Sequence, residues 1–145
     1  PRNLTGATAE RLPLNHGFKA VQIAVSAWTA EALKQTLSAS IFSRSTECHN
    51  QDKVSMGTIA ARDASRVIVL TEQVIAALCC ASVQAIQLKA LDASLAEVLA
   101  AFQAWVLQTF DYVVEDRPLQ HELQQLVDRF ENLELLNSER VYSIG

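Results

Sequence analysis

The central part of the chain contains almost none of the residues that interrupt helices. Among 145 residues there are three prolines, and between Phe18 and Arg117 there is no proline and a single glycine, Gly57. A long interval without helix breakers predicts an all-α fold. The predicted helices run from about Asn15 to Leu37, Gln51 to Lys89, Ala93 to Val113 and Leu119 to Asn137, with an irregular connection over Ser38–Asn50.

The chain also lacks an excess of positive charge. Its 12 Lys and Arg residues and 16 Asp and Glu residues are scattered and give a net charge of −4. Without a basic stripe to neutralise phosphates, neither nucleic acid nor an anionic membrane surface is an expected partner. With 50% hydrophobic residues, a chain of this length has enough apolar material for a core and falls in the size range of one domain.

Cysteine is scarce, with Cys48, Cys79 and Cys80 as its three occurrences. The count is odd, and the adjacent pair lies in an apolar helical segment rather than in a spaced disulfide framework. This usage suits a reducing compartment and predicts a cytoplasmic protein. No signal peptide is apparent at the start, and a chain beginning with Pro1 instead of Met indicates trimming or processing.

The predicted helix from 51 to 89 has an apolar segment with very little charge. From Val67 to Leu88 the only formal charge is Glu72, and Val74–Ala81 is small and apolar on every side. A helix of this kind must be surrounded. A membrane span is the competing interpretation, but Thr71–Gln73 interrupts the apolar run and leaves too few continuous apolar residues to cross a bilayer. An oligomeric bundle, or the remainder of the protein, is therefore expected to cover the helix.

A polar cluster precedes this helix. Glu47-Cys48-His49-Asn50-Gln51 combines a carboxylate, an imidazole and two carboxamides within five residues. On a loop, the two carboxamides can orient a substrate through their donors and acceptors. The simpler alternative is that Ser45, Thr46 and Asn50 cap the long helix, and spacing alone favours capping.

The same cluster does not predict a metal site or a nucleophile. Glu47, Cys48 and His49 are possible zinc ligands, but adjacent side chains do not easily converge on one ion and no second Cys/His pair exists. Cys48 paired with His16, His49 or His121 has no recognisable nucleophile motif around it. No metal is therefore expected.

Several ordered motifs resemble those of the phenylalanine/histidine ammonia-lyase family. They are Pro1-Arg2-Asn3-Leu4-Thr5-Gly6, Gly17-Phe18-Lys19, Glu47-Cys48-His49-Asn50-Gln51-Asp52, Ala61-Arg62, Val83-Gln84-Ala85-Ile86-Gln87-Leu88-Lys89 and Asp116-Arg117-Pro118. The resemblance implies that residues 1–145 are the C-terminal helical part of an aromatic amino acid lyase-like protein. It also implies that the rest of that polypeptide and a homotetramer complete the helical bundle.

The resemblance assigns site residues as well. Glu47 and Gln51 correspond to catalytic residues near the amino and prosthetic groups, and Lys19 and Ile23 to pocket residues near the aromatic ring, while Asn50 joins the substrate-binding set. Lys19 and Ile23 are four residues apart, so one helical face can present both. Without the resemblance, the pair reads as a surface lysine beside an ordinary core isoleucine.

The function implied is ammonia elimination from a phenylalanine-like amino acid to an arylacrylate, or a 2,3-aminomutase reaction in which ammonia re-adds at the β-carbon. Family members use the electrophile 4-methylidene-imidazole-5-one (MIO), made from an Ala-Ser-Gly tripeptide. This chain has no Ala-Ser-Gly, so MIO is expected from a segment absent from it, and these 145 residues alone are expected to be inactive. A histidine ammonia-lyase and a non-catalytic helical assembly module remain alternatives.

Overall fold

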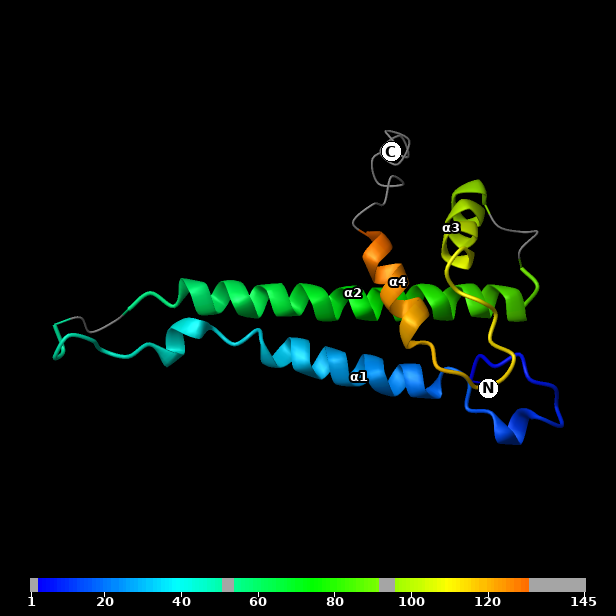
Figure 1. Ribbon diagram of the computed structural model, residues 1–145, viewed down its shortest axis with the longest axis horizontal. Coiled ribbons are helices and arrows are strands. Elements are labelled where there is room, and N and C mark those ends of the chain that lie inside the picture. Colours follow the sequence, from blue (N-terminus) through cyan, green and yellow to red (C-terminus); the bar gives the residue numbers. More distant parts are fainter. Residues whose placement is uncertain (1–2, 51–53, 92–95, 131–145) are drawn as a thin grey trace. The chain divides into compact units, whose positions relative to one another are not determined.

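The computed structural model describes residues 3–50, 54–91 and 96–130, which form helices joined by irregular segments, with no β-strand among them (Figure 1). The predicted all-α fold is confirmed. The elements are the 3-10 helices η1 (Leu12–Leu14) and η2 (Ala39–Phe42) and the α-helices α1 (Lys19–Lys34), α2 (Gly57–Leu88), α3 (Glu97–Leu107) and α4 (Gln120–Phe130). Predicted helical residues at 51–53, 93–95 and 131–137 lie outside the described residues.

Helices α1 and α2 both begin later than the sequence predicted. α1 starts at Lys19 instead of Asn15, because the chain turns at Gly17, whose φ is +55°. α2 starts at Gly57 instead of Gln51, and 54–56 are not helical. The Gly57 amide donates to Ser55 Oγ at 3.4 Å, so a residue close to the helix start pairs the first amide of α2.

The helix ends are also set by local hydrogen bonds. After α2, Ala90 takes a left-handed φ of 52°, its amide donates to Gln87 O at 3.1 Å, and the Leu91 amide donates to Ile86 O at 3.1 Å. This pair of bonds with a left-handed residue is the Schellman arrangement, here with Ala at the position where Gly is common. α3 stops at Leu107, six residues before the predicted Val113. The Val113 amide itself donates to the Gln84 side chain of α2.

The chain divides into two compact units. The first unit combines the N-terminal residues up to Val21 with the chain from Ile75 onward, and the second covers Gln22–Val74. α1 and α2 each contribute residues to both units.

The first unit has a well-packed core. Its fully buried side chains come from α2, α3, α4 and the segment after α3, and Phe18 packs edge-on against Phe110 with ring centroids 6.1 Å apart. The buried members are Phe18, Ala76, Cys79, Cys80, Val83, Val106, Phe110, Val113 and Leu126. Trp105 stacks between Phe102 and Phe130 at 6.2 and 6.1 Å, and the Arg129 guanidinium lies 4.5 Å from the Trp105 ring centroid.

Gln84 of α2 joins three chain segments inside this core. Its side chain is fully buried. The Gln84 amide nitrogen donates to Leu4 O and Val113 O, both at 2.8 Å, and its oxygen accepts from the Val113 amide at 3.0 Å. Because buried backbone groups are costly to leave unpaired, this one side chain ties the N-terminal segment and the segment after α3 to α2.

In the second unit, α1 and the first half of α2 run side by side in opposite directions (Figure 1). The Arg66 Nε atom donates to Glu31 Oε1 at 2.7 Å, and this exposed pair connects the two helices. A groove of about 480 Å³ lies between 35–39 and 60–68. The two helices are joined by a long connection that holds the predicted polar cluster.

By length and apolar composition, α2 satisfies the criterion for a membrane-spanning helix among the residues described. The expectation that Thr71–Gln73 leaves too few apolar residues was therefore wrong. Core helices of soluble proteins satisfy the same criterion, and in the first unit Ala76, Cys80 and Val83 of α2 are buried in the protein core. Only 33% of the most apolar 18-residue stretch of α2 is buried in this single chain, so most of that surface is open to a further partner.

Candidate active-site loop

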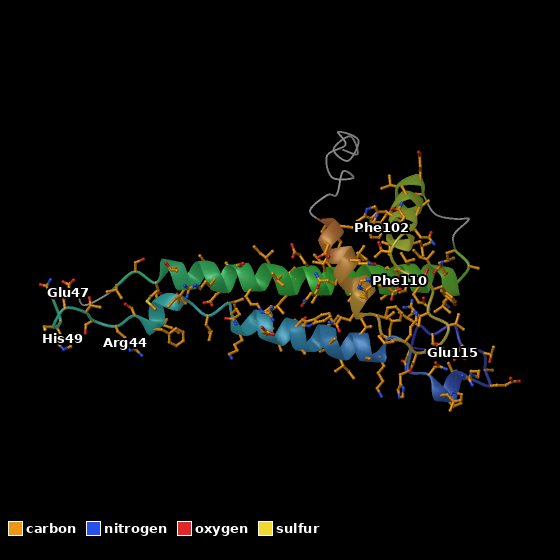
Figure 2. All side chains as sticks on the ribbon, in the orientation of Figure 1. Arg44, Glu47, His49, Phe102, Phe110 and Glu115 are labelled. Carbon is orange, nitrogen blue, oxygen red and sulfur yellow. The ribbon has the colours of Figure 1, made fainter. Side chains whose placement is uncertain are left out.

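The predicted polar cluster lies on a loop whose base is closed by a single residue. Ser43 is buried, and its hydroxyl donates to Val54 O at 3.1 Å and accepts from the Val54 amide at 3.0 Å. We call residues 43–50 together with Val54 the 43–54 loop. Glu47 and His49 lie at the outer end of this loop and Arg44 lies nearer its base (Figure 2), and the whole stretch from 44 to 50 is exposed.

The tip of the 43–54 loop has an unusual backbone. Glu47, Cys48 and His49 have φ values of 51°, 53° and 68°. Three successive non-glycine residues in the left-handed region are rare, and each costs roughly 1–2 kcal/mol relative to ordinary conformations. Two short-range hydrogen bonds lie at the tip, from Asn50 N to Glu47 O at 3.0 Å and between Ser45 Oγ and His49 Nδ1 at 2.7 Å.

This geometry excludes the capping interpretation of the cluster. Ser45, Thr46 and Asn50 lie seven or more residues before Gly57, where α2 begins, and a capping side chain must contact the first-turn amides. A helical reading of Glu47–Gln51 is excluded too, because left-handed residues do not form such a turn. Residues 47–50 lie on a loop, with Glu47 and Asn50 both exposed, and their role toward a substrate stays a prediction. Gln51 lies outside the described residues.

Lys19 and Ile23 lie one turn apart on α1, as expected from their spacing. Lys19 is the first residue of the helix and is exposed. Ile23 is 62% exposed, so the interpretation as an ordinary core isoleucine is wrong for this chain. An apolar side chain that stays open can contact an apolar ligand group or another subunit.

The described site residues do not all belong to one compact unit. Lys19 belongs to the first unit, whereas Ile23, Glu47 and Asn50 belong to the second. Within the second unit, the 43–54 loop lies beyond the C-terminal end of α1 (Figure 1). Ile23 is near the other end of that helix, and eleven residues to Lys34 span roughly 16 Å of helix.

The cysteines and histidines offer little further chemistry. No group of three or more His, Cys, Asp and Glu side chains suited to a metal ion occurs in the described ranges. Cys79 and Cys80 are buried free thiols, and burial raises the pKa of Cys80 to about 12. The Cys80 thiol is therefore protonated and unreactive at neutral pH. Cys48 is free and exposed on the loop.

Sequence reasoning missed the polar network before α1. Asp116 accepts hydrogen bonds from the His16 and Gly17 amides, and these bonds, His16 first, hold the pKa of the Asp116 carboxyl below its ordinary value. The Asp116 amide donates to Asn15 Oδ1 at 2.7 Å. We call residues 3–18 together with 113–116 the clamp. Its partners are about a hundred positions apart in sequence, so no local pattern could reveal them.

Comparison with known proteins agrees with this arrangement. A sequence model of the family described as aromatic amino acid lyase matches residues 1–107. The chain belongs to that family. The match includes α1, the 43–54 loop, α2 and all of α3.

Individual relatives of this aromatic amino acid lyase family member carry several activities in their names. The chain is 37% identical to a tyrosine ammonia-lyase from Cereibacter sphaeroides over 78% of its length, and 29% identical to a histidine ammonia-lyase from Bacillus subtilis over 79% of its length. It covers 22% of each relative. The chain thus spans about a fifth of the length of the curated relatives it matches.

Solved structures share the fold. A tyrosine aminomutase from Streptomyces globisporus superposes with a TM-score of 0.80 at 27% identity, covering 92% of this chain and 25% of that one. A histidine ammonia-lyase from Trypanosoma cruzi gives a TM-score of 0.76 at 25% identity, covering 89% of this chain and 25% of that one. The helical lyase/aminomutase fold is therefore shown for nearly the whole chain.

The family implies MIO, and the residues of this chain do not fit its formation. The sequence has no Ala-Ser-Gly: Ala64-Ser65 is followed by Arg66, and Ala93-Ser94 by Leu95. In the described part of the chain, α2 places Ala64 and Ser65 in an uninterrupted helix. These 145 residues therefore contain no Ala-Ser-Gly from which MIO could form.

Proposed function

We propose that the full-length protein acts on an aromatic, phenylalanine-like amino acid as an ammonia-lyase or 2,3-aminomutase. The observation that carries the proposal is the 43–54 loop of this family member, which holds Glu47 and Asn50 exposed on a left-handed tip. Strained backbone conformations cluster at functional sites. The names of the relatives, which include lyases and an aminomutase, support the reaction class.

The roles of the loop residues follow from the charge of the substrate. An amino acid carries an ammonium group at neutral pH, and Glu47 is a carboxylate that can pair with it or take its proton. The Asn50 and Gln51 carboxamides can hold the amine through hydrogen bonds. These roles make Glu47 and Gln51 catalytic residues and Asn50 a substrate-binding residue.

The ring-binding role falls to α1. The exposed Ile23 offers apolar surface to an aryl ring, and Lys19 lies at the edge of the same helical face. An apolar contact suits a phenyl ring better than a histidine side chain, whose ring nitrogens need hydrogen-bond partners. A phenylalanine-like substrate is therefore favoured over histidine, and histidine ammonia-lyase activity is the first alternative.

MIO is part of the proposal only as a group that another segment provides. When present, it supplies the electrophile that turns an amine into a leaving group. This chain contributes binding, orientation and proton handling, and alone it should not turn over substrate. Borohydride treatment of the full-length enzyme should abolish activity together with an ultraviolet band, and an enzyme that keeps full activity would not contain MIO.

Assembly as a homotetramer is supported by a stripe along α2. Its exposed members recur at alternating steps of four and three residues, and none is charged: Gly57, Ala61, Ala64, Ile68, Thr71, Ile75, Leu78 and Ser82. This is the a/d spacing of helices that pack lengthwise on a partner helix. Ile68 and Leu78 are 58% and 63% exposed, so a second copy, or the rest of the polypeptide, would bury them.

The stripe also favours a second candidate, a helical assembly module without catalysis. That module would need the α2 stripe but not the 43–54 loop chemistry. Both candidates require assembly through the α2 stripe, and light scattering of the full-length protein tests that assembly. Ile68→Glu should lower the mass from that of a tetramer, whereas Arg62→Glu, which is exposed but off the stripe, should leave it unchanged.

Turnover separates the two candidates. The full-length enzyme is offered L-phenylalanine, L-tyrosine and L-histidine, arylacrylate is followed by absorbance, and β-amino acid by chromatography. Glu47→Gln should lower kcat/KM by about a hundredfold. Cys48→Ser, which alters the neighbouring side chain on the same left-handed tip, should stay within about twofold of wild type. Equal activity of Glu47→Gln and wild type would sink the catalytic role of the loop.

A further inference from the structure

The residues that precede α1 are held by the carboxylate of Asp116, which lies about a hundred positions later in the chain. Asp116 Oδ2 accepts from the His16 amide and Oδ1 from the Gly17 amide, each at 2.7 Å. The Asp116 amide in turn donates to Asn15 Oδ1 at 2.7 Å. Three consecutive residues shortly before the helix therefore share one partner.

The same turn is held from a second side. The Phe18 amide donates to Asn3 O at 2.8 Å, and Phe18 is buried against Phe110. A Cβ atom on Gly17 would come within 2.4 Å of Asn3 O, so two segments of the clamp are in close contact there. Lys19, whose amide donates to His16 O at 3.2 Å, is the first residue after these anchors.

We propose that Asp116 is a positioning residue for the ring end of the substrate pocket, because its two bonds to the His16 and Gly17 amides fix the first turn of α1 and thereby Lys19. The inference rests on the proposed function, which places Lys19 beside the aromatic ring. A loosened first turn displaces Lys19, and it does not alter the hydrogen bonds between Ser43 and Val54 that close the 43–54 loop. A misplacement of about 1 Å is enough to change rates substantially.

The neighbouring carboxylate offers a matched control. Glu115 also bonds to the N-terminal segment, accepting from Arg11 Nε and Nη2 at 2.8 and 2.9 Å. Both side chains of that pair are about half exposed, at 52% and 51%. Arg11 precedes η1 and is separated from Lys19 by the Asp116 anchors. Glu115→Gln therefore removes a charge and a contact from the same loop without releasing the start of α1.

The experiment compares Asp116→Asn with Glu115→Gln in the full-length enzyme. The asparagine keeps one acceptor oxygen and replaces the other with a donor, so at least one amide loses its partner. We expect KM to rise about tenfold with kcat within about threefold, and the preference between L-tyrosine and L-phenylalanine to change about fivefold. Glu115→Gln should leave KM, kcat and the substrate preference within about twofold of the wild-type values. A purely structural role would lower the melting temperature without changing the preference.

A second variant and a hydrogen-exchange measurement test the inference further. Asn15→Ala removes the acceptor of the Asp116 amide and also the Asn15 Nδ2 donor to Arg11 O at 2.9 Å. It should raise KM by less than Asp116→Asn does, and it tests the inference if Asp116→Asn does not fold. Hydrogen exchange at residues 16–20 should accelerate about tenfold in Asp116→Asn and not in Glu115→Gln. Unchanged exchange and unchanged substrate preference would overturn the inference. A wild-type enzyme without turnover would overturn the proposed function instead, and exchange would still test whether Asp116 fixes the helix start.

Discussion

The clamp and the 43–54 loop both contain left-handed residues, but they are held in different ways. In the clamp, Asn3, Leu4 and Gly17 have φ values of 45°, 55° and 55°. The Leu4 carbonyl accepts from the buried Gln84, and the fully buried Thr5 donates to Val114 O at 2.8 Å. In the loop, the tip is exposed, and the bonds of Ser45 with His49 and of Asn50 with Glu47 reach at most four residues along the chain.

The comparison shows two uses of the same backbone conformation. In the clamp, buried hydrogen bonds and packing compensate for the strain, so that segment is part of the folded core. In the loop, the exposed tip has little packing to compensate for it, and the conformation should respond to whatever the tip binds. The variants below test this difference, beginning with the largest effect.

Gln84→Leu should damage the clamp most. The change removes the side-chain partner of the Leu4 and Val113 carbonyls and of the Val113 amide. The Val113 carbonyl still accepts from the Gly6 amide at 2.9 Å, so the Leu4 carbonyl and the Val113 amide are the groups that lose their partner. Each buried unpaired group costs about 1–3 kcal/mol, and we expect a loss of at least about 2 kcal/mol and a clear drop in melting temperature. Gln87→Leu is the control on the same helix, since Gln87 Oε1 is buried without a hydrogen-bond partner in the described part. An equal drop in both variants would contradict the assignment.

Gly17→Ala should be the next most harmful change. The residue has a φ of +55°, and the added Cβ would lie 2.4 Å from Asn3 O, a backbone atom that cannot move freely. We expect a loss of about 1–3 kcal/mol, measured by thermal unfolding. Gly57→Ala at the start of α2 meets nothing closer than Ser55 Oγ at 3.5 Å. That control should be neutral or slightly stabilising, since Ala favours helices.

Acid should weaken the Asp116 anchor. Its folded-state pKa is lowered, so its contribution is fully present above the unfolded value of about 3.9 and is lost as pH falls through the folded value. Because the side chain is 39% exposed, the effect is at most about 1 kcal/mol. Asp116→Asn should have a lower melting temperature than wild type at pH 7. The difference between the two melting temperatures should become smaller below about pH 4. A gap that stays constant down to about pH 3 would assign the effect to shape instead of charge.

The smallest change in stability is expected in the 43–54 loop, where the substitution should stabilise the protein instead of destabilising it. Cys48→Gly places a residue that tolerates left-handed φ where the backbone already has φ of 53°. Stability should change by less than about 1 kcal/mol, toward greater stability if anything. The same substitution frees the tip in the absence of substrate, so KM should rise modestly. A strongly destabilised Cys48→Gly would mean that the tip is held as firmly as the clamp.

The sequence predicted the architecture better than the connections. The scarcity of Pro and Gly correctly indicated an all-α chain, and the motifs around Gly17, Glu47 and Asp116 correctly indicated the family. The start of α2 was misplaced by six residues, because polar residues at 45–50 resemble caps while the pairing of Ser43 with Val54 leaves no pattern in sequence. The bonds from Asp116 to His16 and Gly17 join positions 100 and 99 residues apart, which no local periodicity encodes.

The site residues illustrate the same limit. The spacing of Lys19 and Ile23 correctly gave one helical face, because a helix repeats regularly. Their roles, like those of Glu47, Asn50 and Gln51, came from the family resemblance and stay predictions. Burial reversed one expectation, since Ile23 is exposed although an isoleucine on a helix is usually a core residue.

The aromatic stack around Trp105 gives this protein a convenient optical reporter. The chain has two tryptophans, Trp28 and Trp105, and they fall in different compact units. Trp105 lies between two phenylalanine rings with the Arg129 guanidinium 4.5 Å from its centroid. Its emission should therefore change when the α3–α4 packing opens. Replacing each tryptophan in turn by phenylalanine would allow the two units to be observed separately by fluorescence during unfolding.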